Sequence, residues 1–121
     1  MEKYKYRELL LEQQHVEHEL KRIEREINKT WSKKLMRKHK ELNARYRSLS
    51  IQTNAGNLRH VIYSLYTEMG LSMKEFANEL DIQESEIQNI IRKGMITEKL
   101  LDTLCIYFQI KKTQEFMRYI H

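Results

Sequence analysis

The chain has no proline, only three glycines and a single cysteine, and each scarcity removes a class of structure. With so few helix-breaking residues and no regular runs of β-branched residues, helices are expected throughout. A lone cysteine cannot form a disulfide within the chain. Cys105 stands among large apolar residues, which favours a buried structural thiol over a reactive one. The composition therefore predicts an all-α protein.

Long apolar runs are also missing. No segment has membrane-spanning length, and residues 1–20 lack the charged-then-apolar order of a signal peptide, so we expect a cytoplasmic protein with no membrane partner. No glycine-rich phosphate loop and no grouping of nucleophile, base and orienting residue occurs, so we expect no enzyme and no cofactor. His15 and His18, with two glutamates nearby, are better explained as an exposed helix face than as a metal site.

Positive charge is concentrated in one segment. The formal net charge is +5, yet residues 1–28 hold six basic and seven acidic residues, and residues 57–121 hold eight and nine. Between them, residues 29–47 carry eight basic residues against one glutamate. Such a segment favours either contact with nucleic acid or a solvated helix face, and the sequence leaves both possibilities open.

The first part of the chain has a coiled-coil pattern. Apolar or core-tolerant residues recur in steps of three and four at Tyr6, Leu9, Gln13, Val16, Leu20, Ile23 and Ile27. These fit heptad a and d positions, and such a seam must pack against another helix. Gln13 at a core position can fix the register.

The pattern is interrupted at residues 28–32, which leaves two arrangements. Either one long helix runs from about residue 2 to residue 50 through a stutter, or the chain folds back into a hairpin whose second helix spans residues 32–49. No glycine or proline marks a turn, which favours the long helix. We predict a homodimer that uses the side chains Tyr6, Leu9, Val16, Leu20, Ile23, Ile27, Trp31 and Leu35.

A domain boundary is expected at the polar, glycine-bearing residues 51–56. It separates a helical dimerisation region, residues 1–50, from a second domain, residues 57–121. In that domain five helices are predicted, and four of them have a capping residue at their start: Asn57 or Asn54, Ser72, Thr97 and Thr113.

Residues 71–94 are the most informative part of this domain. Ser72 and Glu75 fit a capping box, and residues 81–83 supply a turn to a second helix. That helix has Ile87, Ile90 and Ile91 on one side and ends at Gly94. Two short helices joined by a tight turn are predicted.

An ordered set of residues between 57 and 120 carries a family resemblance. The set comprises Leu58, Ile62, Leu65, Gly70, Leu71, Ser72, Glu75, Phe76, Ala77, Leu80, Ile82, Ile87, Ile90, Leu101, Leu104, Phe108 and Ile110. It resembles the phage-repressor (Xre/Cro-type) helix-turn-helix family over about half of the chain. The resemblance implies a five-helix domain that binds double-stranded DNA, with its second motif helix in the major groove, in a protein that represses by occupying promoter DNA.

The resemblance also implies which residues contact DNA. Base edges would be read by Gln83, Glu84, Ser85, Asn89 and Arg92, whose side chains can pair with them. Phosphates would be bound by Ser72, Lys74 and Lys93. Independently of the resemblance, the basic segment would add Lys33, Lys34, Arg37 and Lys38 if it lies along the DNA backbone. Because Glu84 and Glu86 repel phosphate, an alternative is a protein-interaction module or an antagonist of another regulator, with its partner on the N-terminal helix.

Overall fold

The computed structural model describes residues 5–121. The regular secondary structure in that range is helical, apart from one isolated β-bridge between Ile96 and Ile120. Residues 1–4, where the predicted first helix begins, lie outside the described residues. The helices are α1 (Lys5–Lys29), α2 (Lys33–Thr53), α3 (Leu58–Glu68), α4 (Met73–Glu79), α5 (Glu84–Lys93), α6 (Glu98–Phe108) and α7 (Gln114–Met117). The all-α prediction is confirmed for this part of the chain.

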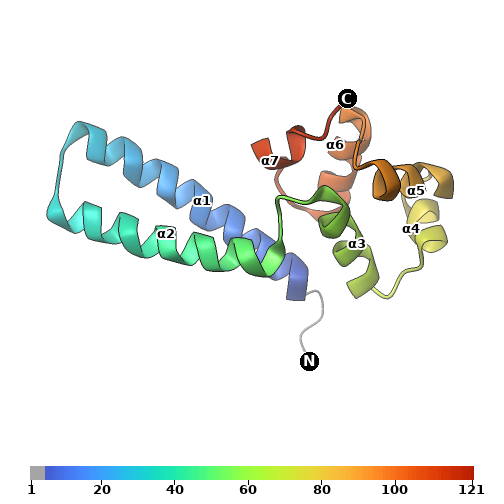
Figure 1. Ribbon diagram of the computed structural model, residues 1–121, viewed down its shortest axis with the longest axis horizontal. Coiled ribbons are helices and arrows are strands. Elements are labelled where there is room, and N and C mark those ends of the chain that lie inside the picture. The colour runs from blue at the N-terminus through green and yellow to red at the C-terminus, as the bar shows by residue number, and fades with distance from the viewer. Residues whose placement is uncertain (1–4) are drawn as a thin grey trace.

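Helices α1 and α2 form an antiparallel hairpin, here called the arm, that projects from α3–α7, here called the body (Figure 1). The chain reverses at residues 30–32, where Ser32 caps α2: its hydroxyl accepts hydrogen bonds from the backbone N–H groups of Lys34 and Leu35, at 3.2 and 3.4 Å. The preference for one long helix is therefore wrong. The hairpin buries the seam of α1 within one chain, whereas a straight helix would leave it bare.

The residues predicted to form a dimer are mostly used inside the chain. Val16, Leu20 and Ile23 are buried, and Val16 and Leu20 pack in a cluster with Leu49 of α2. Four others, Tyr6, Leu9, Ile27 and Leu35, are half-buried. Only Trp31 is left largely in solvent, with 67% of its surface exposed. A homodimer stays a prediction, but it would need a surface other than this seam.

The predicted linker is partly helical. Residues 51–53 form the last turn of α2, and Asn54 ends it with a left-handed backbone, φ 49°. Thr53 is fully buried, and its hydroxyl is satisfied there because it donates to the side-chain oxygen of Gln13. The buried pair explains why this turn stays ordered, and it gives Gln13 a place in the register of the arm. The polypeptide passes from the arm to the body through residues 54–57.

The base of the arm is hydrogen-bonded to the body. The Glu68 carboxylate accepts from the backbone N–H groups of Tyr6 and Arg7, at 2.8 and 2.9 Å, and so satisfies two of the free N–H groups in the first turn of α1. Arg7 Nε donates to the carbonyl of Phe108 at 2.6 Å. Leu10 of α1 is buried in the core of the body. Together these contacts fix the direction in which the arm points.

The core of the body joins all of its helices. Phe76 of α4 is at its centre, stacked on Tyr66 of α3 with ring centroids 4.9 Å apart, and 5.5 Å from the ring of Phe108. Cys105 is buried there as predicted, and burial raises the pKa of its thiol to about 11. The caps at Asn57, Thr97 and Thr113 are confirmed, since each side-chain oxygen accepts from the backbone N–H three residues later.

Candidate nucleic-acid interface

Helix α4 begins at the capping box expected from the sequence. Ser72 Oγ accepts from the N–H of Glu75 at 3.1 Å, and Glu75 Oε1 accepts from the N–H of Ser72 at 2.9 Å. The hydrogen bond from the Ser72 backbone lowers the pKa of the Glu75 carboxyl. Lys74 is exposed beside it. This helix start therefore presents a hydroxyl and a lysine to solvent, as a phosphate contact requires.

A short turn sets α5 against α4. The N–H of Ile82 donates to the carbonyl of Ala77 at 3.0 Å, and Ala77 is buried where the two helices meet. Asp81 in this turn has φ 57°, in the left-handed region that glycine enters most easily. The predicted pair of helices with a turn at residues 81–83 is confirmed.

Helix α5 has one buried and one exposed side. Ile87 and Ile90 are buried, and helical spacing puts Ser85, Asn89 and Arg92 on the opposite side. Glu84 lies in the first turn and Gln83 is the cap before it, and both are also exposed. Asn89 Oδ1 accepts from Arg92 Nη2 at 2.9 Å, so these two side chains already orient each other. The five predicted base-contacting residues are thus all exposed at α5, and we call them together the α5 face.

Cations gather at the end of α5. Arg92 and Lys93 lie in its last turn, and Gly94 ends it with φ 69° and an N–H bonded to the Ile90 carbonyl at 2.7 Å. The Arg59 guanidinium of α3 lies against Gly94: a Cβ placed on that glycine would stand 2.8 Å from Arg59 Nε. Sequence reasoning missed Arg59. It precedes Gly94 by 35 residues, so the two meet only in the folded chain.

Negative charge lies at the opposite end of the same helix. Glu84 and Glu86 occupy the first turn of α5, where carboxylates interact favourably with the helix dipole. The Glu86 carboxylate also accepts from the N–H of Gln83 at 3.3 Å, a capping interaction. Glu86 therefore stabilises the helix, and Glu84 remains available on the exposed side.

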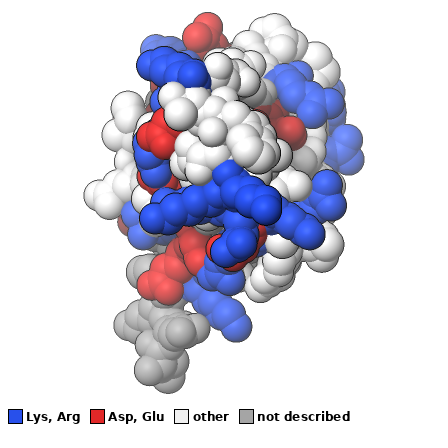
Figure 2. Space-filling view, turned by 90° about the vertical axis from the view of Figure 1, so that its left-hand side faces the viewer, with Lys and Arg blue, Asp and Glu red and all other residues white. Residues whose placement is uncertain are grey.

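The remaining predicted phosphate contacts do not lie near the α5 face. Lys33, Lys34, Arg37 and Lys38 are exposed in the first turns of α2, at the tip of the arm. That tip and α5 are at opposite ends of the molecule (Figure 1). Figure 2 looks at the tip end and shows Lys and Arg side chains across the middle of that surface. The fold therefore separates the basic segment from the predicted reading helix.

A groove of about 350 Å³ runs beside α5 and borders the α5 face at Asn89. Glu86, Asn89 and Ile90 of α5 line one wall, and Met95 and Leu100 are among the residues opposite. Met95 is 45% exposed, so the groove presents apolar surface to solvent. The terminal His121 also lines it, held in place by a hydrogen bond from its N–H to the Ile96 carbonyl at 3.2 Å.

Comparisons with known proteins found no match among family models, curated proteins or solved structures. Within residues 5–121, no helix is long and apolar enough to cross a membrane. The geometry of the α5 face and of the arm therefore carries the functional argument.

Proposed function

We propose that this protein is a sequence-specific DNA-binding regulator, acting as a repressor, with α5 as its reading helix. The observation that supports it best is the α5 face, a row of exposed side chains on a helix anchored by buried isoleucines. A rigid helix with a polar outer side can enter a major groove, about 12 Å wide. The resemblance to phage-repressor regulators points to the same helix.

Each residue of the α5 face has a chemical role in this proposal. Gln83 and Asn89 can each make paired hydrogen bonds with adenine, and Arg92 can do the same with guanine. Glu84 can accept from the amino group of cytosine, and Ser85 can serve several bases. The hydrogen bond between Asn89 and Arg92 holds both side chains before DNA arrives, which reduces the ordering cost on binding.

Phosphate contacts near α5 would come from a small number of groups. Ser72 and Lys74 stand at the start of α4, and Lys93 and Arg59 stand at the end of α5. These groups flank the α5 face, which is the arrangement that positions a reading helix over a groove. Because they are few, we expect the salt dependence of specific binding to be modest.

The test is to select duplex sites from a random pool and to measure binding by gel shift. Asn89→Ala and Arg92→Ala should each weaken binding to the selected site by about 1–3 kcal/mol and relax the preference at one base pair. Asn78→Ala, an exposed asparagine on α4, is the matched control and should bind like the parent. Unchanged binding by both α5 variants would remove this surface from consideration. A selected site with two half-sites would report a dimer.

A second candidate function is a protein-interaction module, favoured by two observations. The body carries more acidic than basic residues, and the groove beside α5 offers exposed Met95 to an apolar side chain of a partner. In this case the protein would bind duplex DNA without sequence preference, or not at all. Met95→Asp should then abolish capture of the partner, whereas it should leave site-specific DNA binding intact if the first proposal holds.

A further inference from the structure

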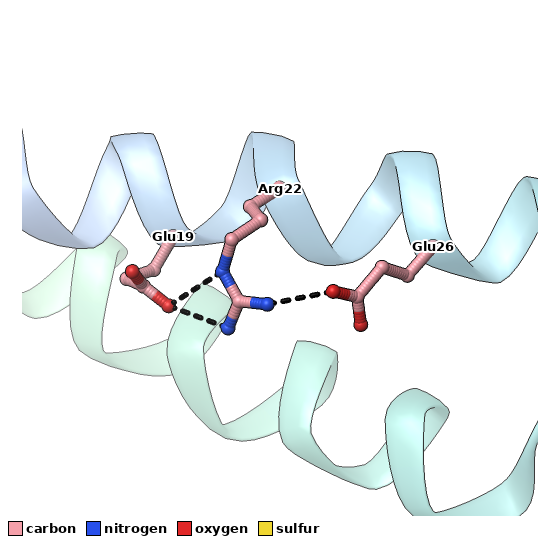
Figure 3. Close-up of polar contacts among 3 residues, drawn as sticks. All are labelled: Glu19, Arg22 and Glu26. Atoms are coloured by element: carbon pink, nitrogen blue, oxygen red, sulfur yellow. Dashed lines mark hydrogen bonds and ion pairs between the residues drawn. The ribbon is translucent and has the colours of Figure 1, made fainter.

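The two helices of the arm differ sharply in charge. Helix α1 contains six basic and six acidic residues, whereas α2 contains seven basic residues and Glu41 alone. In α1 the charges cancel locally: Arg22 bonds to Glu19 at 2.9 Å and to Glu26 at 2.7 Å, as Figure 3 shows. Of the seven basic residues of α2, only Arg45 has an ion pair within the described residues, with Glu12, so one side of the arm keeps an excess of positive charge.

Four cations of α2 form a line, here called the basic stripe: Lys33, Arg37, Lys40 and Arg47. Their spacing places them on one side of the helix, and all four are exposed. Among the described residues, none of the four has a carboxylate within ion-pair distance, whereas Arg45 on the neighbouring line pairs with Glu12. At 1.5 Å per residue the stripe is about 21 Å long.

An aromatic side chain stands beside one end of this stripe. Trp31 lies in the turn two residues before Lys33 and is 67% exposed, although a tryptophan buries a large apolar area when it finds a partner. Met36, in the next turn of chain, is also exposed. The body does not cover either side chain, because the tip is the point of the arm most distant from it (Figure 1).

We propose that the basic stripe and Trp31 form a binding site for single-stranded nucleic acid, separate from the α5 face. A line of cations about 21 Å long matches a linear chain of phosphates, on the order of six at the 3.4 Å spacing of one strand. The exposed indole supplies a surface on which an unpaired base can stack, a contact that every base can make. Cationic tracks with interspersed aromatic side chains are the usual means of binding single strands.

Two other polyanions fit the surface less well. A duplex offers phosphates to the stripe, but its bases are stacked on each other and give Trp31 nothing to cover. An anionic lipid surface would accept Trp31 and Met36 at the tip. Between Lys33 and Arg47, however, the exposed apolar residue on the line of the stripe is the small Ala44, and Ile51 beyond the stripe is a single side chain, which is little to insert into a bilayer. The length of the stripe therefore favours a strand that lies along α2.

Trp31 is the only tryptophan in the chain, so its fluorescence reports directly on this site. A short oligothymidylate added to the chain of residues 1–121 should quench that emission. It should bind with a slope of log K against log salt of about −3, as four neutralised phosphates require. The triple variant Lys33→Gln, Arg37→Gln, Lys40→Gln should reduce the size of the slope by about 2. Trp31→Ala lacks the reporting tryptophan, so its binding is followed through the fluorescence anisotropy of a dye-labelled oligothymidylate. The substitution should weaken binding by about tenfold and leave the slope unchanged.

The controls separate this site from the α5 face. Lys21→Gln removes an exposed lysine of α1 and should bind the strand like the parent, as should Arg92→Ala. Circular dichroism should show unchanged helix content in every variant, because all the substituted side chains lie at the surface. Equal binding of the oligothymidylate by the triple variant and the parent would overturn the proposal. So would equally tight, stripe-dependent binding of a duplex of the same length, or displacement of the strand by vesicles containing phosphatidylserine.

Discussion

The contact between Gln14 and Lys111 should control how firmly the arm is joined to the body. Gln14 is only 6% exposed, and its side-chain amide makes two hydrogen bonds to the backbone of one residue, Lys111. Its Nε2 donates to the Lys111 carbonyl at 3.0 Å, and its Oε1 accepts from the Lys111 N–H at 3.0 Å. These bonds join residues 97 positions apart in the chain, so they are tertiary contacts that form only when the arm packs on the body.

Gln14→Ala removes both bonds together. At about 1 kcal/mol net for each, the free energy of unfolding should fall by about 2 kcal/mol, and the midpoint of urea denaturation by about 1 M. Gln52→Ala is the matched control, because Gln52 is exposed and bonds only to Ser48 of its own helix. It should change the free energy of unfolding by less than about 0.5 kcal/mol.

Gln14→Glu tests the donor alone. Its carboxylate can still accept from the Lys111 N–H, but at neutral pH its second oxygen would face the Lys111 carbonyl, and burial would raise the pKa of the new carboxyl. The protonated acid can donate to that carbonyl. Stability should therefore be close to that of the parent at low pH and be lost as pH rises through the raised pKa.

Both variants are best followed by urea unfolding under circular dichroism and by hydrogen exchange at the Lys111 amide. Gln14→Ala should speed that exchange, and Gln52→Ala should not. The reasoning fails if Gln14→Ala has the midpoint of the parent and the Lys111 amide stays protected, because the two bonds would then contribute nothing to the junction.

Three further outcomes are expected, each from a local feature. Ser32→Ala should lower the free energy of unfolding by about 1 kcal/mol through loss of the cap on α2, measured by thermal melting. Gly70→Ala should destabilise by about 1 kcal/mol because of its positive φ alone, and Gly94→Ala by more, because its Cβ would also displace Arg59; equal losses would show that Arg59 moves away freely. Because the pKa of Cys105 is raised to about 11, its thiol should be alkylated at pH 8 on the order of a hundredfold more slowly in the folded protein than in urea, as measured by mass spectrometry. The neutral thiol also contributes stability that is lost above about pH 9.

The helix boundaries of the body were predictable because they depend on local chemistry. A serine or threonine cap needs only the next three residues, as at Ser72 and Thr97, and a left-handed glycine such as Gly94 needs only the helix before it. The exposed residues of α5 were predictable for the same reason. Once the isoleucines are assigned to the core, helical periodicity sends the polar residues to the opposite side.

The reversal of the chain at Ser32 was not predictable in this way. A heptad seam is satisfied equally by a second copy of the chain and by a later segment of the same chain, and the sequence pattern is identical in both cases. The choice rests on tertiary contacts far apart in sequence, such as Thr53 with Gln13 and Gln14 with Lys111. No local signal identifies such pairs, and Arg59 at the end of α5 was missed for the same reason.

The reversal also decides where the positive charge acts. In a straight helix, the basic segment would have continued directly toward the body, and cations and reading helix could have shared one ligand. Because the chain turns back at Ser32, the stripe begins at the arm tip, and the α5 face lies at the other end of the molecule. Two ligands can then bind without competing for the same residues. Any coupling between them must pass through the base of the arm, where Gln14, Glu68 and Arg7 join the two parts. Gln14→Ala should therefore weaken such coupling while leaving each separate affinity unchanged.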